Sequence, residues 1–138
     1  MTAYTFTNPK NAAIDLVESL IAGRSETYLS GATVSAKFPT AGTPKHVQVE
    51  WDGTPVVAYP VTERAAVRVT CWLPKGQRSN VIDMAGVVQG LLLNESRGSS
   101  DLLAIYPGGG RLPGTDPATG FAFCTFTVRA STKPSAVA

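Results

Sequence analysis

The chain holds few residues that could do acid–base chemistry. His46 is its only histidine, and the nearest carboxylates along the chain are Glu50 and Asp52. A histidine with a well-placed partner can serve as a general base. Alternating polar and apolar residues, however, put His46 on the polar side of a predicted strand, where a lone histidine is usually an exposed surface residue. We expect no catalytic residue, while a small cofactor-free enzyme built on these three residues stays open as an alternative.

The two cysteines, Cys71 and Cys124, lie far apart in apolar runs that are predicted to be strands. A structural zinc site needs four closely grouped ligands, and a redox pair needs short Cys spacing. A free cysteine within an apolar strand is usually a buried core residue. We expect two free thiols, no metal site and no cofactor.

A glycine- and proline-rich stretch at residues 107–120 follows a short predicted strand and looks at first like a phosphate-binding loop. The dinucleotide-binding fingerprint would need glycine at Pro113 and a helix after it. Pro113 and Pro117 are incompatible with that helix. We predict a loop that joins two strands and binds no nucleotide. Ordering so long a loop is costly, so we expect it to be mobile in the free chain and ordered in an assembly.

Composition and charge indicate a globular protein without an obvious nucleic-acid site. The chain has 138 residues, the size of one domain, which we place at residues 1–130 with a flexible tail at 131–138. Its 12 basic and 10 acidic residues give a formal charge of +2, and the basic residues are scattered rather than clustered. Nucleic-acid binders usually concentrate such charge, so a DNA-binding module is only an alternative. No signal peptide or membrane-spanning run is recognisable, which predicts a cytosol-like compartment.

The order of predicted elements gives the fold class. One helix begins at Asn8-Pro9 and ends at Gly23, and a second runs from Ser79 to about Glu95. Asp52-Gly53 is typical of a two-residue hairpin turn. The predicted strands are Thr33–Phe38, His46–Trp51, Val56–Tyr59, Arg64–Leu73, Leu102–Tyr106 and Phe121–Ala130. We predict an α+β fold, with a mixed or antiparallel sheet of five to six strands and two helices packed on one face.

Alternation along the two longest strands predicts which side chains face away from the helices. Odd-numbered residues of Arg64–Leu73 are apolar, and in the last strand the even-numbered residues are the apolar set. The remaining large groups would lie on a sheet face without a helix to cover it, and such a patch usually marks a protein interface. With one arginine of the glycine-rich loop added, the predicted interface residues are Arg64, Arg68, Trp72, Arg111, Phe121 and Phe123. The alternatives are that the loop covers them or that the parity is reversed.

Several segments taken together resemble the small tail terminator (tail completion) proteins of long-tailed bacteriophages. They are the strand Val67–Trp72, the helix segment Ala85–Leu92, and the turn Asp116-Pro117-Ala118-Thr119-Gly120 that leads into Phe123–Val128. That family often has a Gly/Pro-rich loop with a D-x-x-T-G-like turn before the closing strand. The resemblance covers most of the chain, from the first helix to the last strand.

The resemblance implies a structural virion protein rather than an enzyme. Such a protein forms a ring, typically hexameric, that caps the tail tube, ends tube polymerisation and docks the tail to the head connector. It would contact the major tail tube protein and the connector or stopper protein, and DNA would pass through the lumen without specific binding. It would lie at the tail–neck junction of the virion and in the host cytoplasm during assembly. Another neck or head-closure protein is the nearest alternative.

Overall fold

The computed structural model describes residues 3–6, 8–40, 44–52, 56–58, 62–95, 102–132 and 134–137. Within them lie two helices and eight strands. In chain order they are β1 (Ala3–Phe6), α1 (Pro9–Ile21), β2 (Thr33–Ser35), β3 (His46–Trp51), β4 (Val56–Ala58), β5 (Thr62–Leu73), α2 (Arg78–Asn94), β6 (Leu102–Thr115), β7 (Ala122–Thr132) and β8 (Pro134–Val137).

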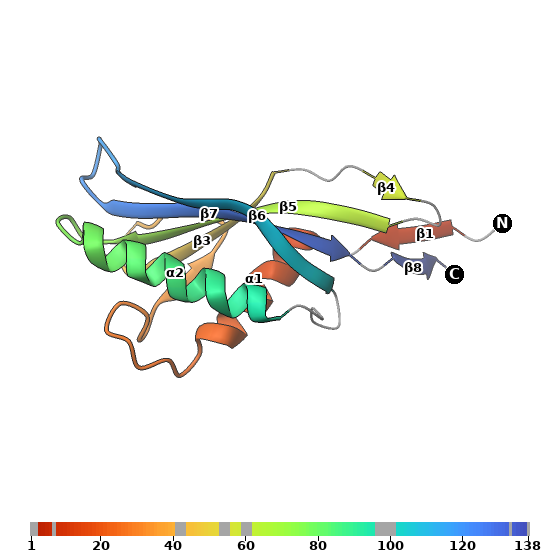
Figure 1. Ribbon diagram of the computed structural model, residues 1–138, viewed down its shortest axis with the longest axis horizontal. Helices are drawn as coiled ribbons and strands as arrows, with labels where there is room; N and C mark the ends of the chain where they lie inside the picture. The colour runs from red at the N-terminus through yellow and green to blue at the C-terminus, as the bar shows by residue number, and fades with distance from the viewer. Residues whose placement is uncertain are drawn as a thin grey trace.

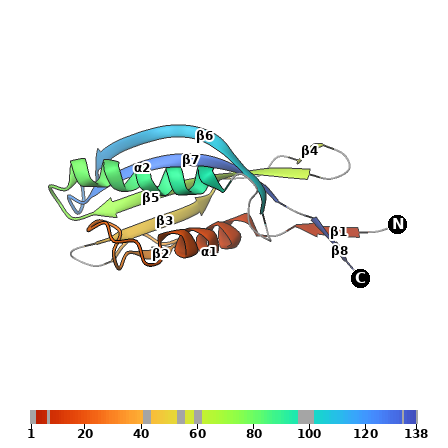
Figure 2. The ribbon, with the colours of Figure 1, turned by 60° about the horizontal axis from the view of Figure 1, so that its bottom comes forward.

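The main sheet has six strands and is mixed. Its order is β2-β3-β5-β7-β6, and β4 pairs with the first residues of β5. Only the β2–β3 pair is parallel among these described strands; the other pairs are antiparallel. Both helices lie on the same side of this sheet, with α1 near β2 and β3 and α2 across β5, β7 and β6 (Figures 1 and 2). The predicted α+β class, with two helices on one face, is confirmed.

Helix α1 forms as its sequence predicts. The side-chain oxygen of Asn8 accepts hydrogen bonds from the backbone N–H groups of Lys10 and Asn11, and Pro9 occupies the first helical position. Just after the helix, Gly23 has a φ of +74°, which glycine adopts without strain. Apolar residues at helical spacing then face the sheet.

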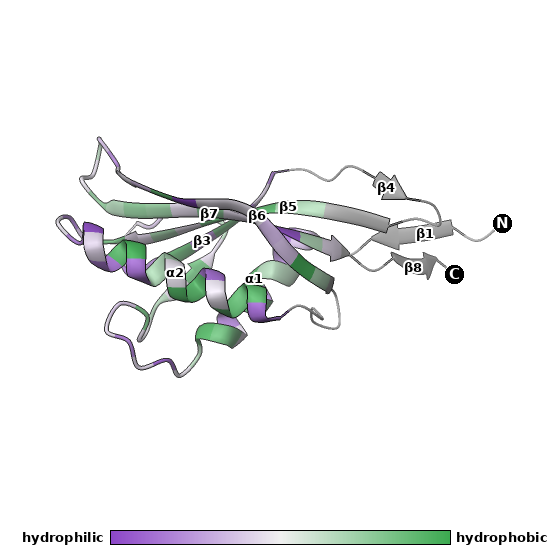
Figure 3. Ribbon diagram, in the orientation of Figure 1, coloured by the Kyte–Doolittle hydropathy of each residue, from purple (hydrophilic) through white to green (hydrophobic). Residues whose placement is uncertain are grey.

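Helix α2 begins at Arg78, two residues earlier than the predicted N-cap at Ser79 implies. Its N-cap residue is Gln77 rather than Ser79, and this cap makes no side-chain hydrogen bond to the helix backbone. Figure 3 shows hydrophobic and hydrophilic residues in turn along this helix. Val81, Met84 and Val88 are buried against the sheet.

The core lies between the helices and one sheet face. Val69 of β5 pairs with Val49 of β3 and with Phe126 of β7, and all three side chains are buried. The odd-numbered residues of β5 from Ala65 to Leu73 and the even-numbered residues of β7 from Ala122 to Ala130 are buried in the same way. The predicted parity of both strands is therefore confirmed, because a strand that is covered on one face must bury every second residue.

Two sequence predictions about turns and loops are wrong. The segment after Asp52 does not return as a hairpin on β3; β4 instead pairs with β5, Val56 opposite Glu63. The predicted loop at 107–120 is mostly strand. β6 continues to Thr115 and pairs with β7 up to the turn that joins the two strands, where Thr115 lies opposite Ala122. Register shifts between Pro107 and Leu112 accommodate the prolines and glycines. The strand predicted over 33–38 is shorter, ending at Ser35.

The described residues near the end of the chain are in strands. Ser131 and Thr132 complete β7, and β8 pairs antiparallel with β1 in a separate two-stranded sheet. We call this pair the terminal ribbon. Within the described residues, no helix is long and apolar enough to cross a membrane.

Candidate interaction surface on the outer sheet face

The sheet face opposite the helices, here called the outer face, is the candidate functional surface. Its residues come from alternate positions of β3, β5 and β7, and the register aligns them in rows across the sheet. One row joins His46, Trp72 and Phe123, and the next joins Gln48, Thr70 and Thr125. The hydroxyl groups of Thr70 and Thr125 share a hydrogen bond of 2.9 Å.

Four aromatic side chains form a cluster at one end of the outer face. The ring centroid of Trp72 lies 4.7 Å from that of Phe38 and 5.2 Å from that of Phe123, and Phe38 stacks on Phe121 at 6.4 Å. These separations fall in the range of favourable aromatic pairs. We call Phe38, Trp72, Phe121 and Phe123 the aromatic cluster.

Trp72 lies on the predicted face but is not an exposed residue. Only 7% of it is accessible, because Phe38 and Phe123 cover its ring and its indole N–H donates to Gln48 Oε1 at 3.0 Å. The accessible part of the cluster is Phe38, at 42%. The expectation that Trp72 forms an open apolar patch is therefore corrected: it supports the patch from beneath.

The middle of the outer face is polar and charged. Arg68 Nη2 lies 3.3 Å from Glu50 Oε2 and 3.4 Å from Asp52 Oδ1, and all three side chains are more than one third accessible. Ion pairs of this exposure contribute about 0–1 kcal/mol. The buried Nε atom of Arg68 has no hydrogen-bond partner in the described part of the chain. The ion pairs of Arg68 therefore fix the positions of Glu50 and Asp52 on the outer face but contribute little to the free energy of unfolding.

A shallow hollow separates these charges from the β6–β7 turn. Its lining includes Arg68, Trp72 and Phe123 on the sheet, and Asp116 and Pro117 from the turn. The turn is well defined: Asp116 Oδ2 accepts hydrogen bonds from the Thr119 hydroxyl at 2.7 Å and its backbone N–H at 2.9 Å. These bonds lower the pKa of Asp116 below its ordinary value. The turn therefore holds a carboxylate at the border of the hollow.

The six residues predicted for the interface do not all meet. Arg68, Trp72, Phe121 and Phe123 belong to the outer face, whereas Arg111 lies across α2, where its Nη1 donates to the carbonyl of Ile82 at 3.1 Å. Gly86 provides the space, because a Cβ there would overlap Arg111. For Arg64 only the backbone is described, paired with Ser131. All six residues remain predictions as interface residues.

His46 is buried rather than exposed, which corrects the sequence expectation. Its Nε2 lies 2.9 Å from the Lys37 carbonyl, which can only accept, so Nε2 carries the proton. Its Nδ1 lies 2.6 Å from the Thr33 hydroxyl. These bonds tie the segment after β2 to β3 and hold Phe38 beside Trp72.

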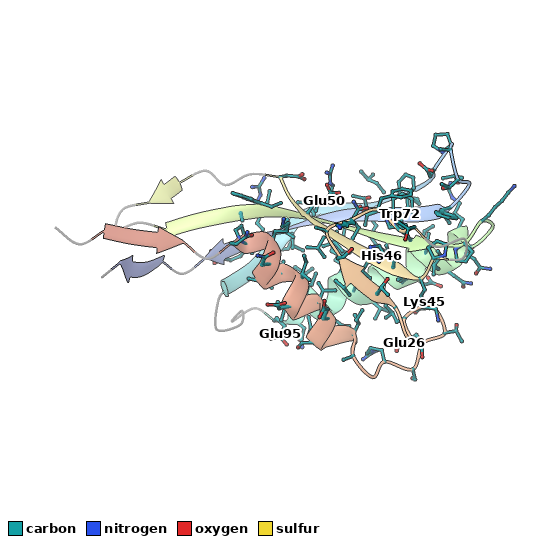
Figure 4. The ribbon with its side chains drawn as sticks, turned by 180° about the vertical axis from the view of Figure 1, so that it is seen from behind. Glu26, Lys45, His46, Glu50, Trp72 and Glu95 are labelled. Atoms are coloured by element: carbon teal, nitrogen blue, oxygen red, sulfur yellow. The ribbon has the colours of Figure 1, made fainter. Side chains whose placement is uncertain are left out.

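The structure does not assemble His46 with the two carboxylates. Figure 4 shows His46 next to Trp72, with Glu50 farther along the sheet. Glu50 lies four positions after His46 along β3, about 13 Å at the usual rise per residue. Glu50 and Asp52 face Arg68 instead. This arrangement does not form the hydrogen-bonded base and partner that acid–base catalysis requires.

The cysteines face the core. Cys71 and Cys124 lie opposite one another on β5 and β7, both are buried, and neither takes part in a disulfide. Burial raises the pKa of both thiols. Among the described residues, no group of three or more His, Cys, Asp or Glu side chains is placed to hold a metal ion.

Sequence reasoning missed two accessible apolar residues of the outer face. Leu112 is 69% accessible and pairs with Thr125, and Phe38 follows β2. Leu112 lies in the segment predicted to be a loop, and Phe38 lies at the end of a predicted strand whose outward-facing residues the sequence did not identify. In the structure Gly114 pairs with Phe123, and a Cβ at Gly114 would overlap the Phe123 ring. A glycine opposite an aromatic residue is typical of strands in which the ring covers the glycine.

Comparisons with known proteins bear on the fold. No protein-family model and no curated protein matches the chain. Among solved structures, the chain is similar to one chain of the "virion of native gene transfer agent (GTA) particle", with a TM-score of 0.68 and 12% sequence identity. The alignment covers 91% of this chain and 98% of that chain. The two chains therefore share a fold along nearly their whole lengths.

Proposed function

We propose that this chain is a structural protein of a phage-like virion, and specifically a tail terminator. Its copies would form a ring, typically a hexamer, on the end of the tail tube. The ring stops tube polymerisation and docks the tail to the head connector.

The observation that carries the proposal is the fold shared with a chain of a gene transfer agent virion. That chain is covered almost completely, so the likeness concerns a whole chain of the particle rather than a common substructure. The segments that resemble tail terminators agree with it, from Val67–Trp72 to the turn at Asp116.

The outer face supplies a surface suited to such an assembly. It presents the accessible Phe38 and Leu112 beside the partly covered Phe121 and Phe123, next to the charged group around Arg68. Protein interfaces typically combine an aromatic centre with a polar border. A ring uses two different surfaces of each subunit, one meeting the other around the axis. We assign the outer face to contacts with neighbouring subunits or with the tube end.

The partners follow from this role. The tail tube protein lies on one side of the ring and the connector or stopper protein on the other, with DNA passing through the lumen. The dispersed charge of this chain, +2 overall, supports transit without specific DNA binding.

The ring can be tested with the purified chain. Native mass spectrometry and negative-stain electron microscopy at micromolar concentration should give closed rings, six copies being the expected number. A protein that stays monomeric at tens of micromolar would contradict the ring.

The terminator role needs a second assay, in which the chain is added to polymerising tail tube protein. Wild-type chain should shorten the tubes and label one end. Leu112→Ser should weaken this capping at least tenfold without lowering the melting temperature, since Leu112 is largely accessible. Trp51→Ser is the matched control, because Trp51 is also accessible, at 47%, but lies at the far end of β3 from the aromatic cluster. Rings that do not bind the tail tube and bind only the connector would indicate another neck protein instead of a terminator.

A further inference from the structure

The terminal ribbon extends away from the rest of the fold. β1 pairs with β8 through four residue pairs, from Ala3 opposite Val137 to Phe6 opposite Pro134. It forms a sheet separate from the six-stranded one, and each of its strands contacts mainly the other. Figures 1 and 2 both show β1 and β8 beyond the end of the main sheet, away from α2.

A ribbon of this kind is not stable by its own contacts. Two-stranded sheets are at best marginally stable in water, and ordering each residue costs about 1–2 kcal/mol. Both outer edges of the ribbon are open within the described chain. Open edges bind further strands through main-chain hydrogen bonds. β8 begins with Pro134, which has no N–H to donate, while β1 contains no proline. The outer edge of β1 is therefore the better edge for pairing.

The main sheet has a complementary open edge. β6 is the last strand in the sheet order, so one of its edges has no neighbour in the described chain. Pro107 and Pro113 interrupt the second part of that edge, and prolines on edges prevent pairing. The first part, Leu102–Tyr106, has five residues and no proline. Its length matches the four residues of β1. At the opposite edge, β2 has only three residues.

We propose that β1 of one copy pairs with Leu102–Tyr106 of β6 in a second copy of this chain. The proposal rests on the ring described above and names one of its contacts. A second copy is the partner because one head-to-tail contact between identical chains pairs the open edge of β1 with the open edge of β6, and the same contact can repeat around a ring. The terminal ribbon thus acts as an arm that joins neighbouring subunits.

Cysteine cross-linking between different chains tests this pairing. The variants Tyr4→Cys and Thr5→Cys lie at the centre of β1 and, as neighbours in a strand, point to opposite faces of it. Each is mixed with Ala104→Cys, at the centre of the β6 segment. Mild oxidation should yield a disulfide-linked heterodimer with one of the two. Mixing the same β1 variants with Val34→Cys, at the centre of β2, is the matched control. Because the native cysteines are buried, wild-type protein should form no intermolecular disulfide under the same oxidation.

A second measurement uses the chain without residues 2–6. Its melting temperature should stay within about 2 °C of wild type, because β1 contacts mainly β8, while its association should weaken at least tenfold. If rings form normally without these residues, or if the β1 variants cross-link only to Val34→Cys, the pairing of β1 with β6 is wrong, while the proposed ring still stands. Cross-links to Ala104→Cys in open filaments rather than rings would support the arm and contradict the ring.

Discussion

Replacing Trp72 tests whether the outer face is a packed layer or merely an accessible surface. Trp72 is 7% accessible, lies between Phe38 and Phe123, and donates its indole N–H to Gln48. Truncating a buried tryptophan to alanine typically costs 3–5 kcal/mol. Because Phe38 leaves the outer side of the cluster partly open, we expect Trp72→Ala to lower the free energy of unfolding by about 3 kcal/mol.

The assay is urea unfolding followed by far-ultraviolet circular dichroism, since removing Trp72 alters the fluorescence itself. Val69→Ser, on the helix side of the same strand, should cost a similar amount, because Val69 is fully buried and a hydroxyl there has no assigned partner. Phe38→Ala, at a 42% accessible residue, should cost about 1 kcal/mol.

A double-mutant cycle separates packing from exposure. Trp72 and Phe38 should show a coupling energy of about 0.5–1.5 kcal/mol, the usual value for aromatic pairs. If Trp72→Ala costs less than about 1 kcal/mol, or the coupling is absent, the cluster does not pack as described and the reasoning fails.

Three further predictions follow from local contacts. Gly114→Ala should destabilise the protein by about 1–3 kcal/mol, since its Cβ would overlap the packed Phe123 ring, while Gly110→Ala, with open space around it, should not; equal melting temperatures would contradict this. Because hydrogen bonds from Thr119 lower the pKa of Asp116, the ionised carboxylate should stabilise the protein at pH values above the ordinary carboxyl pKa, and this stabilisation should be lost as the pH falls below about 4. Asp116→Asn should abolish this part of the pH dependence of the melting temperature. Thiol titration should find two free thiols per denatured chain and almost no reaction in the native state; a reducible bond would refute it.

The helices and the sheet parity could be predicted because they depend on neighbours in the chain. Asn8 caps α1 through backbone groups two and three residues away, and alternation along β5 needs only a covered face and an uncovered one. Both signals are periodic and local, so a single sequence contains them.

Strand pairing and side-chain partners could not be predicted in the same way. β4 pairs with β5 and not β3, and β6 continues through Pro107 and Pro113 because an edge strand tolerates proline and bulges. Arg68 meets Glu50 and Asp52 only because β3 and β5 align in one register.

For the candidate site, alternation along the two longest strands was enough to predict that Trp72 and Phe123 share the face without helices, and their pairing across β5 and β7 places them there. Only the tertiary structure decided that Trp72 is covered and Phe38 accessible. That outcome depends on His46, whose hydrogen bonds to Thr33 and Lys37 place the segment after β2 over the sheet. Contacts of this kind leave no periodic pattern in the sequence, because their geometry is set by how the strands pair and not by the spacing of residues along one strand.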